Sequence, residues 1–324
     1  MKDPWRVGAG GWLTTGVGST VYAGLGFHSL RRHSLDAGLS LWFGQSYFAA
    51  YLKGKVRLGG NVPSYLSIDG LVSRKKYYDS LPFFFSSGDV SSFISHDCFG
   101  RVSYQVGAGR SAYAAASLSA GKAYGVGKAR LAFRYLYDTL DERTFPTEGR
   151  RIHAEVSGTR YDAPAARGAE VRGRLKFEGS WNNYYRIGNS FRIGALARAG
   201  LAVGSPFSDR DTESMLATSF EPIEILSNCY LPALRGDDYI ALGAVPVWCP
   251  MSNLQVRGEA YAYTGLRDGG AWKAPFSTTE FIGRVSVVGT LPFATLSVSA
   301  AYCTPLSGWN FSLALGWYVP APHD

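Results

Sequence analysis

The sequence predicts an all-β protein, a 16-stranded antiparallel β-barrel that crosses a membrane. Three observations predict this class: sixteen segments with alternating apolar and polar residues, a composition rich in glycine and aromatic residues, and connections that are alternately short and long. Alternation with a period of two is typical of a strand whose two faces meet different surroundings. No linker interrupts the pattern, so residues 1–324 are expected to form a single outer-membrane barrel domain.

The clearest pattern is a hairpin in residues 128–161. In its first arm, Leu131 and Phe133 alternate with Arg130 and Arg134, and the second arm alternates in the same way. Each arm has about ten residues or more, which suits a tilted transmembrane strand, whereas strands of soluble sheets average about five or six. A long hairpin of a soluble β-protein is the alternative interpretation of this stretch taken alone.

The remaining strand segments extend on both sides of this hairpin. They are Trp5–Leu13, Thr20–Leu30, His33–Phe43, Tyr47–Leu58, Tyr65–Arg74, Phe99–Gly107, Ala112–Gly121, Arg172–Tyr185, Phe191–Val203, Tyr239–Trp248, Leu254–Tyr263, Phe276–Val288, Ala294–Tyr302 and Trp309–Val319. With the two arms of the hairpin they make sixteen, an even number as expected for a bacterial barrel. In the segment that starts at Arg172, Leu175, Phe177 and Trp181 are predicted to face lipid, and Arg174 and Lys176 the lumen.

The composition fits a barrel and excludes a helical membrane protein. The chain has 39 Gly, 20 Tyr and 18 Phe, only 18% of its residues are charged, and its mean hydropathy is close to zero. No apolar run approaches the roughly 18 residues of a transmembrane helix. The first residues contain no apolar signal core, so we expect the signal peptide of the natural protein to be absent from this chain.

The net charge of +8 does not indicate nucleic-acid binding. Basic residues such as Lys53, Lys55 and Arg57 occupy alternate strand positions, which predicts a basic lumen and no basic surface patch. The four cysteines lack the spacing of metal ligands, so no metal is expected, and their three disulfide pairings remain open.

No catalytic motif is present. The sequence lacks G-x-S-x-G, H-E-x-x-H, and the Walker and Rossmann glycine patterns, so we expect this chain to be no enzyme and to bind no cofactor. The triplet Asp268-Gly269-Gly270 resembles a motif of patatin-type lipases, but its place in a predicted outer loop favours a turn.

Connection lengths predict the orientation. Every second connection is short, as expected of periplasmic turns, and the longer ones alternate with them as outer loops. With the amino terminus on the periplasmic side, Gly204–Asp237 is the sixth outer loop, and its length suggests a function.

The turn inside the 128–161 hairpin carries a recognisable motif. The string YDTLDERTFPTEGRRI resembles the turn before the ninth strand in the BamA/TamA-type outer-membrane superfamily, also called bacterial surface antigens. The matching residues are Asp138, Asp141, Phe145, Pro146, Thr147, Gly149 and Arg150. The resemblance implies a barrel of the bacterial outer membrane with this turn on the periplasmic side.

The same resemblance extends to the sixth outer loop. Arg235 and Gly236 match the family's hydrophobic-Arg-Gly-aromatic tip, which folds back into the lumen, although Asp237 stands where the family has an aromatic residue. A buried guanidinium needs an acceptor, so a lumenal carboxylate is expected beside Arg235. The candidates, in order of preference, are Glu259, Glu178 and Asp138.

Over nearly the whole chain, the resemblance is closest to the barrel that ends patatin-like phospholipases of the Bacteroidetes kind. The similar strings are WRVGAGGWLTT, YDTLDERTFPTEG and LRGDDYIALGAVPVW. In such proteins a signal peptide, a patatin hydrolase domain and usually one POTRA module precede the barrel. The resemblance therefore implies a membrane anchor and translocation route for a lipase domain that this chain lacks.

Other functions stay open beside this one. The alternatives are the barrel of an outer-membrane assembly or translocation factor, a porin-like channel and, more weakly, a soluble β-protein. The expected partners are outer-membrane lipid, the barrel assembly machinery and the missing passenger domain, with a homodimer left open and nucleic acid excluded. In the family the last strand is the signal that the assembly machinery reads, and here Trp309, Phe311, Leu313, Leu315 and Trp317 alternate with smaller residues.

Overall fold

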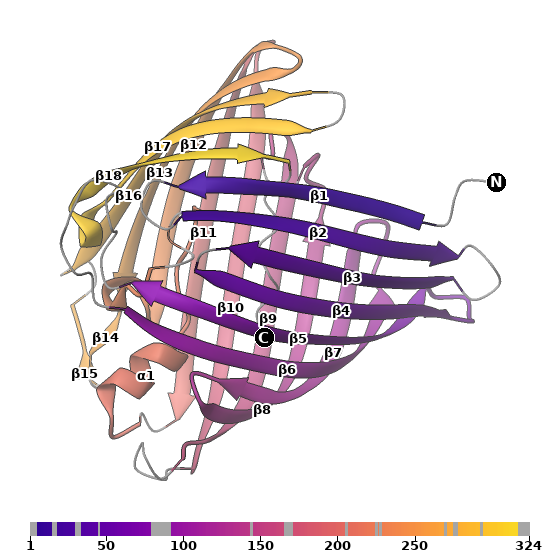
Figure 1. Cartoon of the computed structure of the whole chain (residues 1–324), viewed down its shortest axis with the longest axis vertical. Coiled ribbons are helices and arrows are strands. Elements are labelled where there is room, and N and C mark those ends of the chain that lie inside the picture. Colours follow the sequence, from indigo (N-terminus) through magenta and orange to yellow (C-terminus); the bar gives the residue numbers. More distant parts are fainter. Residues whose placement is uncertain are drawn as a thin grey trace.

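A computed structural model describes residues 5–14, 18–29, 34–44, 46–78, 92–142, 145–164, 171–204, 207–223, 226, 229–268, 271–274, 278–291 and 294–316. Within these ranges the strands close into an antiparallel barrel (Figure 1). Its strands are β1 (Trp5–Thr14), β2 (Gly18–Ser29), β3 (Leu35–Gly44), β4 (Tyr47–Leu58), β5 (Ser64–Tyr78), β6 (Ser92–Gly107), β7 (Ala112–Ala123), β8 (Val126–Asp138), β9 (Gly149–Asp162), β10 (Val171–Ile187), β11 (Phe191–Gly204), β12 (Tyr239–Met251), β13 (Leu254–Gly265), β16 (Thr279–Thr290), β17 (Thr295–Cys303) and β18 (Gly308–Leu315).

The closed ring confirms the predicted fold class. Each of the sixteen barrel strands of the described residues pairs with its neighbours in the chain, and β18 pairs with β1 to close the ring. Closure matters because a membrane-spanning sheet with an open edge would leave its backbone groups without hydrogen-bond partners in lipid. The described part of the chain contains no helix with the length and hydropathy needed to span a bilayer.

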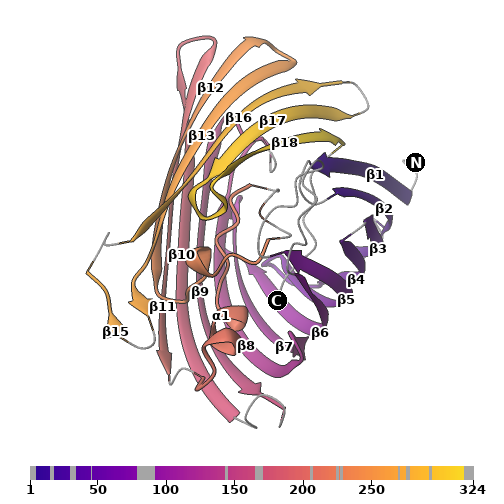
Figure 2. The same ribbon diagram turned by 60° about the vertical axis from the view of Figure 1, so that its left-hand side comes forward.

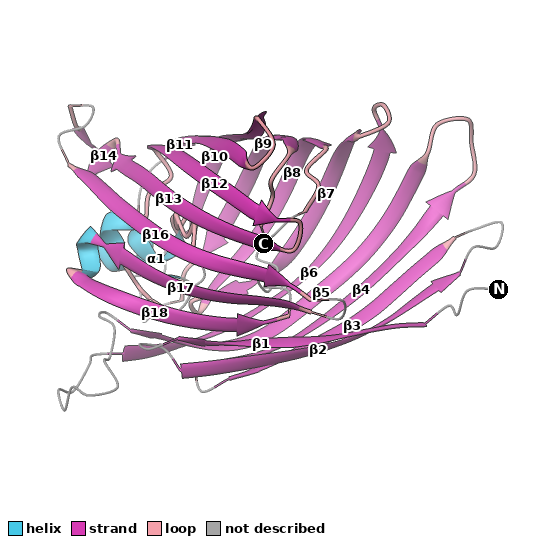
Figure 3. Cartoon of the chain, turned by 90° about the horizontal axis from the view of Figure 1, so that it is seen from above, coloured by secondary structure: helices cyan, strands magenta, loops and turns pink. Residues whose placement is uncertain are grey.

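Smaller elements are present in addition to the sixteen barrel strands. The connection between β11 and β12 contains α1 (Arg210–Leu216) and the 3-10 helix η3 (Pro232–Leu234), and a second 3-10 helix, η4 (Thr304–Leu306), follows β17. Two short strands, β14 (Arg267–Asp268) and β15 (Ala271–Trp272), pair with each other in the loop after β13. Helix α1 lies at the end of the barrel opposite to that at which β1 begins (Figure 3).

The faces of the strands are divided as predicted. On β10, Phe177 is 41% exposed on the outer surface, whereas Arg174 is 8% exposed and points inward. The same division holds on β8, where Leu131 and Phe133 are exposed and Arg130 pairs with a carboxylate inside the barrel. An apolar outer face and a polar inner face are what a bilayer-spanning barrel requires, and they define this chain as an outer-membrane protein.

The third outer hairpin is longer than predicted. Strand β5 continues to Tyr78 and β6 begins at Ser92, beyond the expected limits at Arg74 and Phe99. The added outward position Lys76 is polar, because strand ends that extend beyond the hydrocarbon no longer need an apolar outer face. The central residues of the connecting loop fall outside the described ranges.

The seam between the first and last strands is short. Residues Gly11–Thr14 of β1 pair with Ser312–Leu315 of β18, while β1 pairs with β2 along its whole length. The outward residues of β18, from Trp309 to Leu315, are exposed as predicted. Trp317 and the residues after it lie outside the described ranges.

Candidate functional site in the lumen

The periplasmic turn between β8 and β9 is organised by Asp141. Its Oδ1 accepts hydrogen bonds from the backbone amides of Glu142, Thr147 and Glu148 at 2.9–3.1 Å, and its Oδ2 accepts one from the Thr147 hydroxyl at 2.6 Å. Such short-range side-chain-to-backbone bonds let an aspartate stabilise a turn without help from other elements. The motif residues Asp141 and Thr147 thus stabilise the turn by binding each other.

Gly149 closes this turn in a conformation that favours glycine. Its φ is +100°, and a Cβ there would lie 2.1 Å from the Thr139 carbonyl oxygen. A side chain would clash with the backbone at that distance, so the glycine of the motif is required by the close approach of the two strands.

The turn also reaches inward to a distant strand. Phe145 is buried, and the Pro146 carbonyl accepts a hydrogen bond from Arg257 Nη1 of β13 at 2.8 Å. Glu259 lies beside Arg257, with 3.5 Å between Nε and Oε1, and accepts two hydrogen bonds from Arg284 Nη2 at 2.8 and 2.9 Å. The periplasmic turn therefore joins a buried ionic cluster on the inner wall.

The sixth outer loop packs against the inner wall of β12, β13, β16 and β17. Phe220, Ile223, Leu226 and Leu234 of the loop are buried in one apolar cluster with the inward side chains of these strands. Phe220 stacks on Tyr263, with ring centroids 5.4 Å apart. The loop thereby buries apolar area that would otherwise face a wet lumen, which is a favourable exchange. Figure 2 shows α1 and this loop between the strand walls.

Hydrogen bonds within the loop bring its two halves together. The amide of Phe220 donates to the Leu234 carbonyl, and the amide of Gly236 donates to the Thr218 carbonyl. Asp209 caps the amino end of α1 by accepting from the amides of Asp211 and Thr212. These bonds place the tip, residues 235–238, in a fixed position beside the barrel wall.

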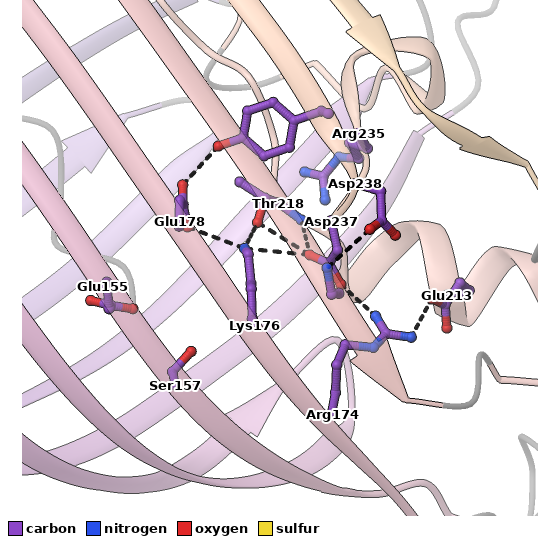
Figure 4. Close-up of polar contacts among 12 residues, drawn as sticks. Glu155, Ser157, Arg174, Lys176, Glu178, Glu213, Thr218, Arg235, Asp237 and Asp238 are labelled. Atoms are coloured by element: carbon purple, nitrogen blue, oxygen red, sulfur yellow. Dashed lines mark hydrogen bonds and ion pairs between the residues drawn. The ribbon is translucent and has the colours of Figure 1, made fainter. Parts of the chain in front are cut away.

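The tip is joined to β10 by ion pairs (Figure 4). Asp237 Oδ2 accepts from Arg174 Nη1 at 2.5 Å, and Asp237 Oδ1 lies 3.4 Å from Lys176 Nζ. Arg174 also binds Glu213 of α1, and the Thr218 amide donates to Asp237 Oδ1 at 3.1 Å. Burial raises the pKa of Asp237, but Lys176 and Arg174 outweigh that effect and hold the pKa below its usual value. The carboxylate is therefore charged at neutral pH.

Arg235 is surrounded by aromatic rings from the loop itself, from β5 and from the turn between β7 and β8. Its guanidinium lies 5.0 Å from the ring centroid of Tyr230, 5.8 Å from that of Tyr124 and 5.9 Å from that of Tyr77. It donates to the Met215 carbonyl at 3.1 Å and to the Tyr124 hydroxyl at 3.3 Å. Cations bind to aromatic faces in this manner because the ring quadrupole attracts positive charge. We call the tip residues Arg235, Asp237 and Asp238 the lumenal clasp.

The predicted carboxylate partners of Arg235 must be corrected. Glu259 is directly opposite Arg284 in the register of β13 and β16 and is bound to it. Glu178 accepts hydrogen bonds from Arg198 Nε at 3.0 Å and from the Tyr239 hydroxyl at 2.8 Å.

Asp138 is excluded by its position along the barrel. It ends β8 at the periplasmic side, where it lies 3.8 Å from Arg151, whereas Arg235 precedes the outer end of β12. A strand of this length spans roughly 40 Å, so the two residues lie at opposite ends of the lumen.

Asp238 completes the clasp, and Gly236 lies between two of its residues. A Cβ at Gly236 would lie 3.0 Å from the Tyr263 hydroxyl, so the loop tip approaches β13 closely. Asp238 Oδ1 accepts from the Ala202 amide at 3.0 Å, and its Oδ2 lies 3.6 Å from Arg267 Nε. The clasp therefore connects the β5–β7 side of the barrel with β10, β11 and β13.

Three residues of this site have roles that the sequence pattern does not predict. Tyr77 and Tyr124 hold Arg235, and Asp237 was recognised only as a departure from the family pattern. Among the described residues, no three His, Cys, Asp or Glu side chains gather as a metal site would require.

The fold and the outer face define a 16-stranded β-barrel of the bacterial outer membrane, and comparison with solved structures supports that class. BamA from Haemophilus ducreyi lacking POTRA domains 1–3 matches 97% of this chain and 70% of its own, with 10% identity and a TM-score of 0.60.

CdiB barrels are similar to this chain to nearly the same extent as BamA. CdiB from Acinetobacter baumannii has 8% identity and a TM-score of 0.59, and CdiB from Escherichia coli has 12% identity and a TM-score of 0.59. Each match covers 97% of this chain but only 60% and 63% of the respective CdiB chains. No family model and no curated protein matches the sequence.

Proposed function

We propose that this chain is the membrane barrel of a translocation protein, which anchors an N-terminal passenger domain and gives it a route across the outer membrane. The observation that carries the proposal is the lumenal clasp, which crosses the interior of a closed barrel and is bound on both sides. Such an arrangement keeps the lumen obstructed at rest and makes its opening depend on a conformational change.

The clasp also bears on the porin-like alternative. A porin conducts through a permanently open lumen, whereas here Asp237 attaches a 34-residue connection, residues 205–238, to β10, and Arg235 attaches it to β5. We expect low and irregular single-channel conductance in planar bilayers. A large, steady conductance would favour the porin.

The short seam supports a lateral route. Among the described residues, strands β1 and β18 share the pairing of Gly11–Thr14 with Ser312–Leu315, and few backbone hydrogen bonds of this pairing must break to separate them. Gly316 lies next to the seam with φ of +92°, and a Cβ there would lie 2.8 Å from the Gly10 Cα. The two strands therefore approach closely at a point where only glycines fit.

The passenger domain is proposed from sequence resemblance. The strings shared with barrels of patatin-like phospholipases run in the same order along the chain, so we propose a lipid acyl hydrolase as the passenger. The coding sequence upstream of this chain tests the assignment: a G-x-S-x-G elbow supports it. Several POTRA repeats without a hydrolase would instead favour the second candidate, an assembly factor. The similarity of this fold to that of BamA supports this second candidate.

Locking the seam tests the route. In a full-length protein whose four native cysteines are replaced by serine, Leu13→Cys with Leu313→Cys places a disulfide between directly paired residues of β1 and β18. We expect this cross-link to abolish surface exposure of the passenger. The matched control, Val298→Cys with Leu313→Cys, joins β17 to β18 and should leave exposure unchanged. Equal exposure in both proteins would reject the lateral route.

A further inference from the structure

A cavity of about 500 Å³ lies between the sixth outer loop and the inner wall of the barrel. Eight basic and four acidic side chains line it, and two further carboxylates, Glu155 and Glu213, neutralise Arg130 and Arg174 from outside the lining. Positive charge therefore remains in excess over negative charge on the cavity wall.

One of these basic side chains, Lys75, is deeply buried. This residue is 5% exposed, points into the barrel from β5 and lines the cavity. Within the described residues, the contact of its ammonium is with the Tyr77 ring, 4.6 Å from the centroid. Asp97 on the adjacent strand β6 accepts instead from the Ser95 hydroxyl and the Tyr124 amide. A buried ammonium without an anionic partner is costly.

Arg235 adds a second cation to this wall, and the Glu221 carboxylate, which lines the same cavity, attracts it electrostatically. Its hydrogen bonds go to a carbonyl and a phenol, and its Nε is buried without an acceptor. The hydroxyls of Ser73, Ser157 and Thr159 line the same cavity and provide neutral donors. The two cations Lys75 and Arg235 beside hydroxyl donors match a doubly charged oxyanion better than a single carboxylate.

We propose that this cavity binds a phosphate group, with the Lys75 ammonium as its main counter-ion. Two chemical sources supply such a phosphate, a small soluble phosphate and the phosphomonoester headgroup of a lipid, and both present the same oxyanion to Lys75. The proposal is independent of the passenger and of the route that it takes.

Titration of the purified barrel in an uncharged detergent tests the binding. Inorganic phosphate, added at constant ionic strength set with sodium chloride, should bind saturably in calorimetry and raise the thermal midpoint. We expect Lys75→Gln to bind phosphate at least about tenfold more weakly, the effect of losing one charge-assisted hydrogen bond. Lys75→Arg should retain most of the affinity.

Lys53→Gln is the matched control, because Lys53 is a lysine of the adjacent strand β4 that does not line the cavity. It should bind phosphate as the unaltered protein does. Equal affinity in the Lys75→Gln and Lys53→Gln proteins would overturn the proposal.

Vesicles separate the two sources and cover the case in which Lys75→Gln does not fold. The unaltered barrel is reconstituted in phosphatidylcholine with and without phosphatidic acid, and its thermal midpoint is measured. A rise with phosphatidic acid but not with inorganic phosphate assigns the lipid headgroup, and a rise with inorganic phosphate assigns the soluble source. If neither ligand raises the midpoint, the cavity binds no phosphate.

Discussion

Two connections reach inward from opposite ends of the barrel, and they are stabilised in different ways. In the periplasmic turn, Asp141 is bound by amides within seven residues of itself. In the sixth outer loop, Asp237 is bound by Arg174, which is 63 residues away in the sequence. The turn can form as soon as its hairpin forms, whereas the clasp can form only after β10 has joined the barrel.

The turn is stabilised mainly by its own residues, whereas the clasp is stabilised by distant strands. The turn has an internal hydrogen-bond network and one outside link, from Pro146 to Arg257. The clasp depends on ionic and aromatic contacts with several strands, so its release would free the lumen while leaving the strands paired. We therefore expect changes in the clasp to alter conductance, and changes in the turn to alter assembly.

The largest effect is expected from Asp237→Ala. This change leaves the guanidinium of Arg174 and the ammonium of Lys176 without their shared acceptor, and breaking a buried ion pair costs about 3–5 kcal/mol. Urea unfolding in detergent should show the loss, and planar-bilayer recordings should show larger and longer openings. Asp211→Ala removes an exposed carboxylate of the same loop and serves as the control. Unchanged conductance in Asp237→Ala would show that the clasp does not obstruct the lumen.

Gly149→Ala should produce the next largest effect, this time on assembly. The new Cβ would lie 2.1 Å from a backbone oxygen at a φ of +100°, so the turn must distort at a cost of about 1–3 kcal/mol. Pulse-chase appearance of the heat-resistant form on semi-native gels should be slowed. Gly158→Ala in the same strand meets no atom within 4 Å and should assemble normally. Normal assembly of both variants would show that the glycine of this turn is not needed for assembly.

Arg235→Ala is predicted to lower heat resistance on semi-native gels by less than Asp237→Ala does. The lost contacts are aromatic rings and neutral acceptors, which together are worth about 1–2 kcal/mol. Arg235→Lys keeps the charge, and its heat resistance should fall between that of the unaltered protein and that of Arg235→Ala. If heat resistance is unchanged in Arg235→Ala, the inference that this arginine fixes the loop tip is wrong.

The strand faces and the turn could be predicted because their causes are local. Alternation along β10 identified Phe177 as outward and Arg174 as inward, and the motif around Asp141 contains the partners of that carboxylate. These features depend on residues next to each other in the sequence, and a period of two or a short spacing is enough to reveal them.

The partners of Arg235 could not be predicted because they depend on the register of distant strands. Tyr77 lies near the end of β5, in an extension that the alternating pattern did not reveal, and Tyr124 lies in a two-residue turn between β7 and β8. Glu259 shares the lumenal face, as predicted, but the register of β13 and β16 places Arg284 opposite it. The alternating pattern of a single sequence shows which face a residue is on, but it does not show which residue of the neighbouring strand lies opposite it.

The smallest effect expected concerns pH and again distinguishes the clasp from the turn. Because the pKa of Asp237 is lowered in the folded protein, its contribution to stability is complete above the usual aspartate value of 3.8 and disappears as pH falls through the lowered value. Conductance should therefore be constant between about pH 5 and 8, and openings should lengthen only below about pH 4. Asp237→Asn should abolish this acid response. If the response persists in that variant, another group controls the loop.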